Sequence, residues 1–424
     1  MKKVLMIAYG GGHINMVLPV ARLLRDEGHL TPLILGLTTA RNAVVAAGFT
    51  CIGLRDFITD ADHLALARGR ELASGLDTSA VGDEESAAYL GLNWADLVAT
   101  QGQTVAEALY SAQGRQCFLP VATMARVLQA TGADLLLTTS APRAERAAVL
   151  AAARLGVPAV CMVDLFAAYE IAWLREPGYA ERICVLNPYV RDKLLAAGRP
   201  PEDVVVTGNP AFDAINRSEV IAAGRALRLA RGWGDAGEPA SPVVVTWISQ
   251  VEPAAHACRP GEVGDPTLPA QIRKLLSAIC QQLEDTVLVC RPHPSETPFE
   301  WALPPDNWLS PCGERLHPLL HASDLVVVIT STVGLEAAIA GKVVLQVLGS
   351  LYSDDAPYLS YGVAQRAVTL DALPQALAEQ VVGVRLRRRA SPPGASVAVD
   401  CKGAPDSAAK AVAACVAELL RAQA

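Results

Sequence analysis

The sequence predicts an α/β protein of two doubly wound, Rossmann-like domains that face each other across a cleft. Short, continuously apolar runs alternate with helical stretches rich in alanine and leucine along most of the chain. This alternation is typical of a parallel sheet covered by helices on both faces. It stops at a segment rich in Gly and Pro, 231–242, and then starts again. The chain of 424 residues is also long enough for two domains of about 200 residues each.

The first half, residues 1–216, is expected to form the N-terminal domain. Its elements alternate in this order: strand 4–9, helix 15–27, strand 31–36, strand 134–139, helix 143–155, strand 158–163, strand 183–187, helix 188–197 and strand 204–208. Residues 40–130 have weaker strand signals and an acidic stretch, LDTSAVGDEES. We expect helices and loops at the periphery of the domain there.

Residues 217–242 are expected to be a linker, and residues 243–403 a second Rossmann-like domain. The expected order in this domain is strand 243–249, helix 268–283, strand 286–291, helix 315–322, strand 324–330, helix 333–340 and strand 343–348. Residues 404–424 read as a closing amphipathic helix. Ligands of such sheets bind beyond the carboxyl ends of the strands, so we look for the site there.

Composition excludes several classes of function. The net charge is −7, and there is no basic face of the kind that nucleic acid requires. The longest apolar runs are too short to cross a bilayer, and the apolar run 4–9 is too short for a signal peptide. The ten cysteines are scattered and form no CxxC pair. Reduced, buried thiols in a cytoplasmic protein explain them better than disulfides or zinc.

The first candidate site is the turn after the first strand, YGGGHIN, which contains Gly11, Gly12 and His13. Asn15 stands where the G-x-G-x-x-G fingerprint needs its third glycine, and the lysine of a P-loop is missing as well. We interpret the turn as facing a substrate; the alternative is tight packing of strand and helix. His13 could act as a general base or contact the substrate, or it could cap its own turn.

The second candidate is RPHPSE, which follows the strand 286–291. Pro292 and Pro294 stiffen the chain on both sides of His293, and Arg291 ends the strand. Such an Arg and His are well placed to meet a phosphate or a base. The alternative is a surface loop whose histidine contacts only backbone.

The third candidate is the turn into the helix 333–340. Ser331 and Thr332 could cap this helix or share its N–H groups with an anion, with Gly334 in the first turn. Glu336 could bind the hydroxyls of a ribose or simply favour the helix dipole.

Other signals are weaker. His317 and His321 have the i, i+4 spacing of two metal ligands, but no third ligand is evident, and we predict no metal site. The basic run VRLRRRA, 384–390, suggests peripheral contact with an anionic membrane, although a solvated loop is the alternative.

Four motifs together resemble the GT-B superfamily of nucleotide-sugar enzymes: GGGH, VVVTGNPAFDAI (204–215), RPHPSE and ITSTVGLEAAIAGK. The resemblance covers most of the chain and is strongest at 183–215 and 286–348. It implies that the second domain binds a UDP- or CMP-sugar without a metal or another cofactor. It also implies a role for each residue: Arg291 and His293 would contact the nucleotide, Ser331, Thr332 and Gly334 the phosphates, and Glu336 the ribose.

The motifs resemble two kinds of enzyme within this superfamily. The TGN-x-x-x-D-A pattern is similar to UDP-N-acetylglucosamine 2-epimerases. Those enzymes carry a GTRPE-like turn where this chain has YGGGH, and only Asp164 and Glu170 stand in their acidic catalytic segment. The YGGGH turn instead resembles glycosyltransferases that act on lipid carriers or natural products. The HP and Ser/Thr pairs resemble bacterial sialyl- and Kdo-type transferases.

We therefore predict a metal-independent glycosyltransferase that moves a sugar from a nucleotide-activated donor to an acceptor hydroxyl. His13 and Asp164 are the predicted catalytic residues, and Gly11 and Gly12 are expected to approach the nucleotide sugar. The alternatives are a UDP-N-acetylhexosamine 2-epimerase, hydrolysing or not, and a nucleotide-binding scaffold without turnover. The base, the sugar, the acceptor, the stereochemical course and the oligomeric state stay open.

Overall fold

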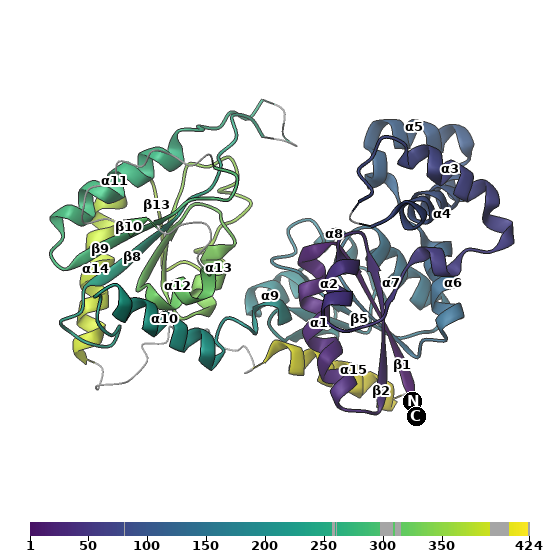
Figure 1. The fold of residues 1–424 in the computed structure, drawn as a ribbon, viewed down its shortest axis with the longest axis horizontal. Coiled ribbons are helices and arrows are strands. Elements are labelled where there is room, and N and C mark those ends of the chain that lie inside the picture. The colour runs from purple at the N-terminus through teal and green to yellow at the C-terminus, as the bar shows by residue number, and fades with distance from the viewer. Residues whose placement is uncertain are drawn as a thin grey trace. The chain divides into compact units, whose positions relative to one another are not determined.

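The chain folds into two compact units, each built on its own parallel sheet (Figure 1). The structure, a computed structural model, describes residues 1–79, 81–256, 259, 261–296, 308–309, 315–390 and 407–422. Unit 1 comprises Met1–Asp213 and Gly403–Ala424, and unit 2 comprises Ala214–Lys402. The predicted α/β class with two Rossmann-like sheets is confirmed.

Unit 1 contains a seven-stranded sheet in the order β3-β2-β1-β4-β5-β6-β7, and every pair is parallel. The strands are β1 Lys2–Tyr9, β2 Leu30–Leu37, β3 Cys51–Ile52, β4 Leu135–Thr139, β5 Ala159–Met162, β6 Arg182–Val185 and β7 Val204–Val206. Residues 4–8 of β1 have no exposed surface, because helices cover both faces of the central strands.

The main helices of unit 1 connect these strands. They are α1 Gly11–Asp26, α2 Ala40–Ala46, α3 His63–Ala73, α4 Asp83–Gln101, α5 Gln103–Gln113, α6 Val121–Thr131, α7 Ala144–Leu155, α8 Ile171–Leu174, α9 Pro188–Ala196 and α15 Ala408–Ala422. Helices α3, α4 and α5 form a group beside the sheet (Figure 1). A Cβ on Gly69 would lie 2.0 Å from the Ala87 carbonyl oxygen, and one on Gly91 would lie 2.1 Å from that of Ala65. Only glycine therefore allows α3 and α4 to pack this closely.

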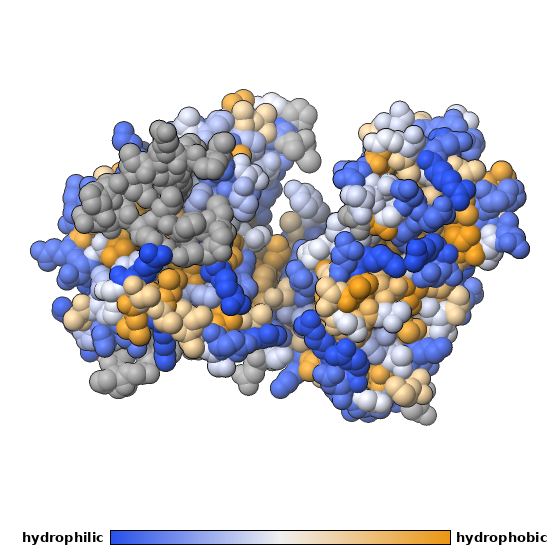
Figure 2. Space-filling model, in the orientation of Figure 1, coloured by the Kyte–Doolittle hydropathy of each residue, from blue (hydrophilic) through white to orange (hydrophobic). Residues whose placement is uncertain are grey.

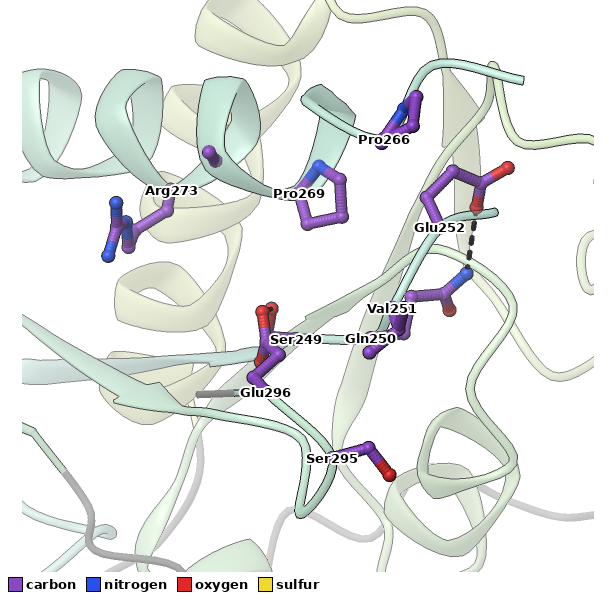
Figure 3. A pocket seen from close by; sticks show the side chains of 10 residues that line it. Ser249, Gln250, Val251, Glu252, Pro266, Pro269, Arg273, Ser295 and Glu296 are labelled. Atoms are coloured by element: carbon purple, nitrogen blue, oxygen red, sulfur yellow. Dashed lines mark hydrogen bonds between the residues drawn. The ribbon is translucent and has the colours of Figure 1, made fainter. Parts of the chain in front are cut away.

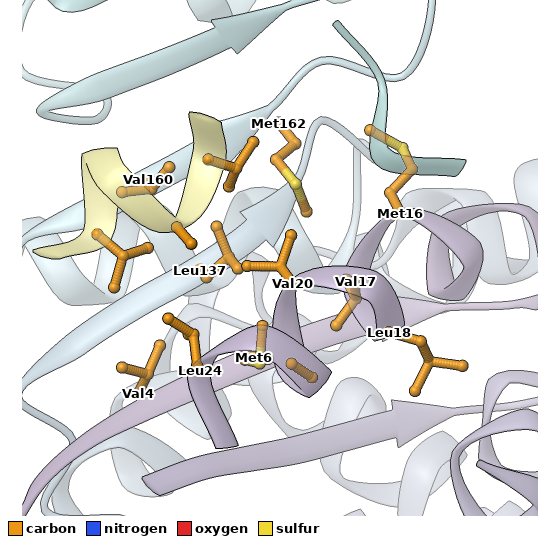
Figure 4. Packing of buried hydrophobic residues seen from close by; sticks show 14 of the residues in the cluster. Val4, Met6, Met16, Val17, Leu18, Val20, Leu24, Leu137, Val160 and Met162 are labelled. Atoms are coloured by element: carbon orange, nitrogen blue, oxygen red, sulfur yellow. The ribbon is translucent and has the colours of Figure 1, made fainter. Parts of the chain in front are cut away.

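The core of unit 1 includes the C-terminal helix. Side chains of β1, α1, β4 and β5 pack together (Figure 4), and Val412, Val416 and Leu420 of α15 join the same cluster. Asp213 caps α15: its carboxylate accepts hydrogen bonds from the N–H groups of Ala408 and Ala409, both 2.9 Å long. The aspartate of the TGN-x-x-x-D motif thus fixes the last helix on unit 1, because it binds N–H groups that have no partner within the helix.

Unit 2 contains a six-stranded parallel sheet in the order β10-β9-β8-β11-β12-β13. Its strands are β8 Val243–Ile248, β9 Thr286–Arg291, β10 Trp308–Leu309, β11 Leu325–Val328, β12 Val343–Val347 and β13 Arg366–Val368. Its helices are α10 Ser218–Ala230, α11 Leu268–Gln282, α12 Leu316–Ala322, α13 Val333–Ile339 and α14 Leu373–Ala390. Side chains of α11 and α14 pack with those of the sheet in one core cluster, whose largest member is Trp247.

The segment expected to be a linker, 217–242, differs from that expectation. Half of it is helix α10, which packs so closely on α12 that a Cβ on Gly224 would lie 2.4 Å from the Cβ of His321. The division between the units falls before it, between Asp213 and Ala214. The Gly- and Pro-rich part, 231–242, leads directly from α10 into β8 and belongs to unit 2.

A buried ion network holds this part of unit 2 together. Arg228 of α10 lies 3.0 Å from Asp324, and Arg388 of α14 lies 2.6 Å from the same carboxylate. Asp324 also accepts the N–H of Val244 at 2.8 Å. The remaining guanidinium bonds reach backbone carbonyls, including that of Pro242. A single carboxylate therefore joins α10, α14 and β8.

The basic run 384–390 is the last part of α14 and not a loop. Arg388 is almost fully buried in the ion network, and Arg385 donates a hydrogen bond to the Glu284 carbonyl. Two of the four arginines in this run, Arg385 and Arg388, are thus bound within unit 2. The other two, Arg387 and Arg389, are exposed.

We expect Asp324→Ala to lower the free energy of unfolding by about 3–5 kcal/mol, because it leaves two buried guanidinium groups without their counter-charge. Urea unfolding followed by tryptophan fluorescence measures the change. The control is Glu84→Ala, which removes an exposed ion pair with Arg70 and should cost less than about 1 kcal/mol. Equal losses in the two variants would contradict a structural role for the network.

Candidate functional site

The candidate site of unit 1 lies at the carboxyl edge of its sheet. The register pairs Ile7 with Thr138 and Thr138 with Cys161, so β1, β4 and β5 end side by side. The residues that follow these strands are therefore neighbours: the glycine turn after β1, Ser140 after β4 and Asp164 after β5. Asn209, after β7, reaches the same edge, since its side chain bonds to the backbone of Asp164.

The turn after β1 needs glycine at one position only. Gly10 has φ of 83°, a conformation that residues with a side chain rarely adopt. Gly11 and Gly12 begin α1, are exposed, and a Cβ on either would have no described atom within 4 Å. Packing does not explain these two glycines. They leave open surface at the start of α1, where backbone N–H groups point outward.

His13 lies in the first turn of α1, close to a buried carboxyl group that the sequence analysis missed. Glu145 of α7 has no exposed surface, and its Oε1 accepts the N–H of Tyr9 at 2.6 Å. Within the described part of the chain, His13 Nδ1 and Glu145 Oε2 are both buried without a hydrogen-bond partner. Burial raises the pKa of Glu145, and the charge of His13 acts against that rise. The two side chains are thus electrostatically coupled.

Asp164 is the second carboxyl group near His13. Burial raises its pKa, and His13 again opposes the rise. Its backbone is held on both sides: the N–H lies 3.2 Å from Ser140 Oγ, and the carbonyl accepts a 2.6 Å bond from Asn209 Nδ2. The structure therefore brings the two residues predicted to be catalytic to one edge, with Glu145 as a third titratable group. Such a cluster can accept and return a proton.

We expect Glu145→Gln to flatten the pH dependence of stability. The pKa of Glu145 is raised in the folded chain, so above the ordinary glutamate pKa the folded state binds the proton more tightly than the unfolded state does. Wild-type stability therefore falls as the pH rises through the raised pKa. The amide cannot ionise, and its oxygen can still accept the Tyr9 N–H. The stability of the variant relative to wild type should thus increase with pH.

Urea unfolding at several pH values between 4 and 9 measures this difference. A difference that does not vary with pH would mean that Glu145 titrates as it does in the unfolded chain.

In unit 2, the loop after β9 is bound to the end of β8. Glu296 Oε2 accepts the N–H of His293 at 2.6 Å, and its Oε1 accepts the hydroxyl of Ser249 at 2.9 Å. His293 Nδ1 accepts the N–H of Ser295 at 3.1 Å, which places the ring proton on Nε2. The ring is half-buried, as is Arg291 at the end of β9. His293 can therefore donate a hydrogen bond from a fixed orientation.

The turn between β11 and α13 is also fixed from several sides. The side chain of Gln250 accepts the N–H of Thr330 at 3.0 Å and donates to its hydroxyl at 3.1 Å. The hydroxyl of Tyr358 donates to the carbonyls of Thr330 and Ser331. Ser331 and Thr332 stand at this turn, and Thr332 is exposed.

Gly334, expected near phosphate, has a packing role in the structure. Its N–H donates to the Ser331 carbonyl at 2.9 Å, and a Cβ would lie 3.0 Å from both Tyr358 and Val328. The glycine is buried and lets α13 approach Tyr358 closely. The main role of Gly334 is therefore to position the turn between β11 and α13.

Glu336, one turn into α13, lies 2.9 Å from His317 Nε2 of α12. His321 contacts the Ile215 carbonyl instead, also at 2.9 Å. The two histidines thus have separate partners and do not converge on one point. The described residues contain no group of three or more His, Cys, Asp or Glu side chains that could hold a metal ion.

A pocket of about 230 Å³ lies at the carboxyl ends of β8 and β9 (Figure 3). Its walls come from Ser249–Glu252, from Ser295 and Glu296, and from the start of α11, including Pro269 and Arg273. Gln250 donates to Glu252 of the same loop at 3.3 Å, and Glu252 also accepts the N–H of Leu351 at 2.9 Å. Gln250 and Glu296, which line the pocket, also bind the Thr330 turn and the backbone of His293.

Sequence patterns did not indicate Glu145, Gln250, Glu296 or Tyr358, nor the contact of His317 with Glu336. Glu145 lies in an alanine-rich helix and carries no motif. Glu296 is the last residue of the RPHPSE motif, three positions after His293. This short spacing could have indicated that its carboxylate binds the backbone of the same loop. Gln250, His317 and Tyr358 lie far in sequence from the residues that they contact, so only the fold could reveal them.

No family model and no curated protein sequence matches this chain. Solved structures do match it over nearly its whole length. The S. aureus MnaA–UDP co-structure is 15% identical and has a TM-score of 0.56, with 99% of this chain and 97% of that one covered. UDP-GlcNAc 2-epimerase from Neisseria meningitidis, bound to UDP-GlcNAc, is 12% identical with a TM-score of 0.55 over 98% and 100%. MurG from Acinetobacter baumannii is 14% identical with a TM-score of 0.53 over 99% of both chains.

The chain has the fold of these proteins. At such low identity the likeness concerns the fold alone, and it confirms the predicted fold of two Rossmann-like domains. Among the described residues, no helix has both the length and the apolar character that crossing a membrane requires. On the face shown in Figure 2, apolar side chains lie scattered among hydrophilic ones.

Proposed function

We propose that the protein is a metal-independent glycosyltransferase that moves a sugar from a UDP- or CMP-activated donor to an acceptor hydroxyl. The observation that carries this proposal is His13. It directly follows Gly11 and Gly12, beside which the structure has open space, and its Nδ1 is buried without a hydrogen-bond partner among the described residues. Its charge also interacts with the buried carboxyl group of Glu145. A histidine backed by a carboxyl group is suited to take the proton of an attacking hydroxyl.

In this mechanism the nucleotide belongs to unit 2. Breaking the bond between sugar and phosphate develops negative charge on the leaving phosphate, and fixed donors lower the energy of that state. Arg291, the Nε2–H of His293 and the hydroxyls of Ser331 and Thr332 are the proposed donors. Gln250 and Tyr358 would keep the last two in place, because they bind the backbone of the same turn.

Glu336 is the proposed partner of the ribose hydroxyls. A carboxylate can accept hydrogen bonds from two neighbouring hydroxyls. The contact of His317 Nε2 with Glu336 Oε2 orients this carboxylate. Gly334 would act indirectly, through the packing of α13 on Tyr358. The seven cysteines that the structure describes are free thiols, in keeping with a cytoplasmic location, which we also propose.

A second candidate is a UDP-N-acetylhexosamine 2-epimerase, in hydrolysing or non-hydrolysing form. The specific observation in its favour is a pair of carboxyl groups, the buried Glu145 and the half-buried Asp164, which both interact electrostatically with His13. Moving a proton at a sugar carbon calls for such acid–base groups. An epimerase would convert or hydrolyse its substrate with no acceptor present, whereas a transferase would need one. NMR of UDP-N-acetylglucosamine incubated with the protein alone separates the two.

We expect isothermal titration calorimetry to show binding of UDP or CMP, and Glu336→Ala to weaken it roughly 10-fold or more, since one hydrogen bond to a charged group contributes about 1.5–3 kcal/mol. Glu262→Ala, on the surface of the same unit, is the control. If neither nucleotide nor its activated sugars give heat, both enzyme proposals fail. Binding without any turnover would instead support a scaffold.

We expect His13→Ala to lower kcat by roughly 10²–10⁴-fold, the usual contribution of a general base, with nucleotide affinity unchanged. His29→Ala removes an exposed histidine of unit 1 and should leave kcat unaltered. Equal losses of turnover and nucleotide affinity in His13→Ala would place His13 at the donor instead.

A further inference from the structure

We infer that Asn209 and Lys193 are positioning residues for Asp164: they hold the loop after β5 by its backbone carbonyls. The inference rests on the proposed function only in so far as Asp164 takes part in the reaction. The placement of the carboxyl group itself can be tested without any substrate.

The backbone of this loop is bound by side chains from three other segments. Ser140, after β4, lies 3.2 Å from the Asp164 N–H, and Asn209, after β7, donates to the Asp164 carbonyl at 2.6 Å. Lys193 of α9 donates from its Nζ to the carbonyls of Phe166 and Ala167, at 3.1 and 2.7 Å. The loop is thus held by side chains along its length, although it has no regular structure of its own.

The loop also contains a strained residue. Ala167 has φ of 49°, in the left-handed region that residues other than glycine rarely adopt. Such a conformation persists only where the surroundings determine it. One of the two carbonyls bound by Lys193 belongs to this residue, so the lysine holds the strained position directly.

Each holding side chain is itself fixed. Asn209 is almost fully buried, and its Oδ1 accepts the N–H of Ala211 at 2.9 Å, so its Nδ2 has to point toward Asp164. Lys193 is half-buried with a pKa lowered by burial, and the charge of Glu170 acts against that change. Because the ammonium group of Lys193 donates to two backbone carbonyls, it fixes the conformation of the loop backbone.

This arrangement has a consequence for the chemistry of Asp164. Asp164 is half-buried in the held loop, and this burial raises the pKa of its carboxyl group, whereas the charge of His13 opposes the rise. If the loop is released, the group gains access to solvent and its pKa should fall toward the ordinary aspartate value. A merely structural role for Asn209 would leave this titration unchanged.

The experiment compares Asn209→Ala with wild type. The protein is labelled with [4-¹³C]aspartate, the Asp164 signal is assigned with Asp164→Asn, and its pH titration is followed by NMR. We expect the titration of Asp164 in Asn209→Ala to move to lower pH. Where turnover is measurable, kcat should fall roughly 10- to 100-fold, as expected for a misplaced catalytic group, with little change in KM.

The matched control is Asn93→Ala. Asn93 is also a buried asparagine of unit 1 whose Nδ2 donates to a carbonyl, that of Tyr89, at 2.7 Å. It belongs to α4 and should not move the titration of Asp164. An unchanged titration in Asn209→Ala, or an equal shift in Asn93→Ala, would overturn the inference.

If Asn209→Ala does not fold, Lys193→Met is measured in its place. The same shift is expected, and an unchanged titration would again overturn the inference. Absence of turnover in wild type would refute the proposed function while leaving the titration result valid.

Discussion

The candidate sites depend on one constraint, the parallel pairing of every strand in both sheets. Parallel neighbours cannot be joined by tight turns, so the chain has to cross back through a helix or a long connection each time. All carboxyl ends of a sheet then meet at one edge. In unit 1 this edge gathers His13, Glu145 and Asp164, which are far apart in the sequence. In unit 2 it gathers His293 and the turn 330–332. Two positions next to these residues use the left-handed backbone region: Gly10 in the turn before His13 and Ala167 in the loop after Asp164.

The turn after β7 supports two separate parts of unit 1. Asn209 binds the loop that carries Asp164, and Asp213, four residues later, caps the C-terminal helix. Helix α15 in turn completes the core around α1, β4 and β5. A short motif thus joins the position of a catalytic candidate to the stability of the helix that closes the unit. This gives the TGN-x-x-x-D pattern a physical meaning that does not depend on any one reaction.

The edge of unit 2 is built from loops that bind one another. Ser249 and Gln250, after β8, reach Glu296 and Thr330, and Tyr358 holds the same turn as Gln250. These bonds order the polar groups before a ligand arrives, and such preorganisation lowers the cost of binding. The buried Arg228–Asp324–Arg388 network joins helices α10 and α14 to β8 and so supports the sheet that carries these loops. The buried ion network thus stabilises unit 2, whereas the loops at the carboxyl ends of its strands form the candidate site.

The sequence alone determined the class of fold and the central strands, because continuously apolar runs such as 4–8 and 325–328 are typical of a sheet covered on both faces. The short strands β3, β10 and β13 carry no such run and were not predicted. It also pointed to the turns at Gly11–His13, Arg291–His293 and Ser331–Glu336, since strand ends followed by glycine, proline or hydroxyl residues are visible in one dimension. The structure alone decided which side chains meet. Glu145 lies in an alanine-rich helix, Gly334 allows close packing, and 218–230 is a helix of unit 2 although it was expected to be part of a linker. Contacts between distant segments depend on register and helix packing, which local patterns do not contain.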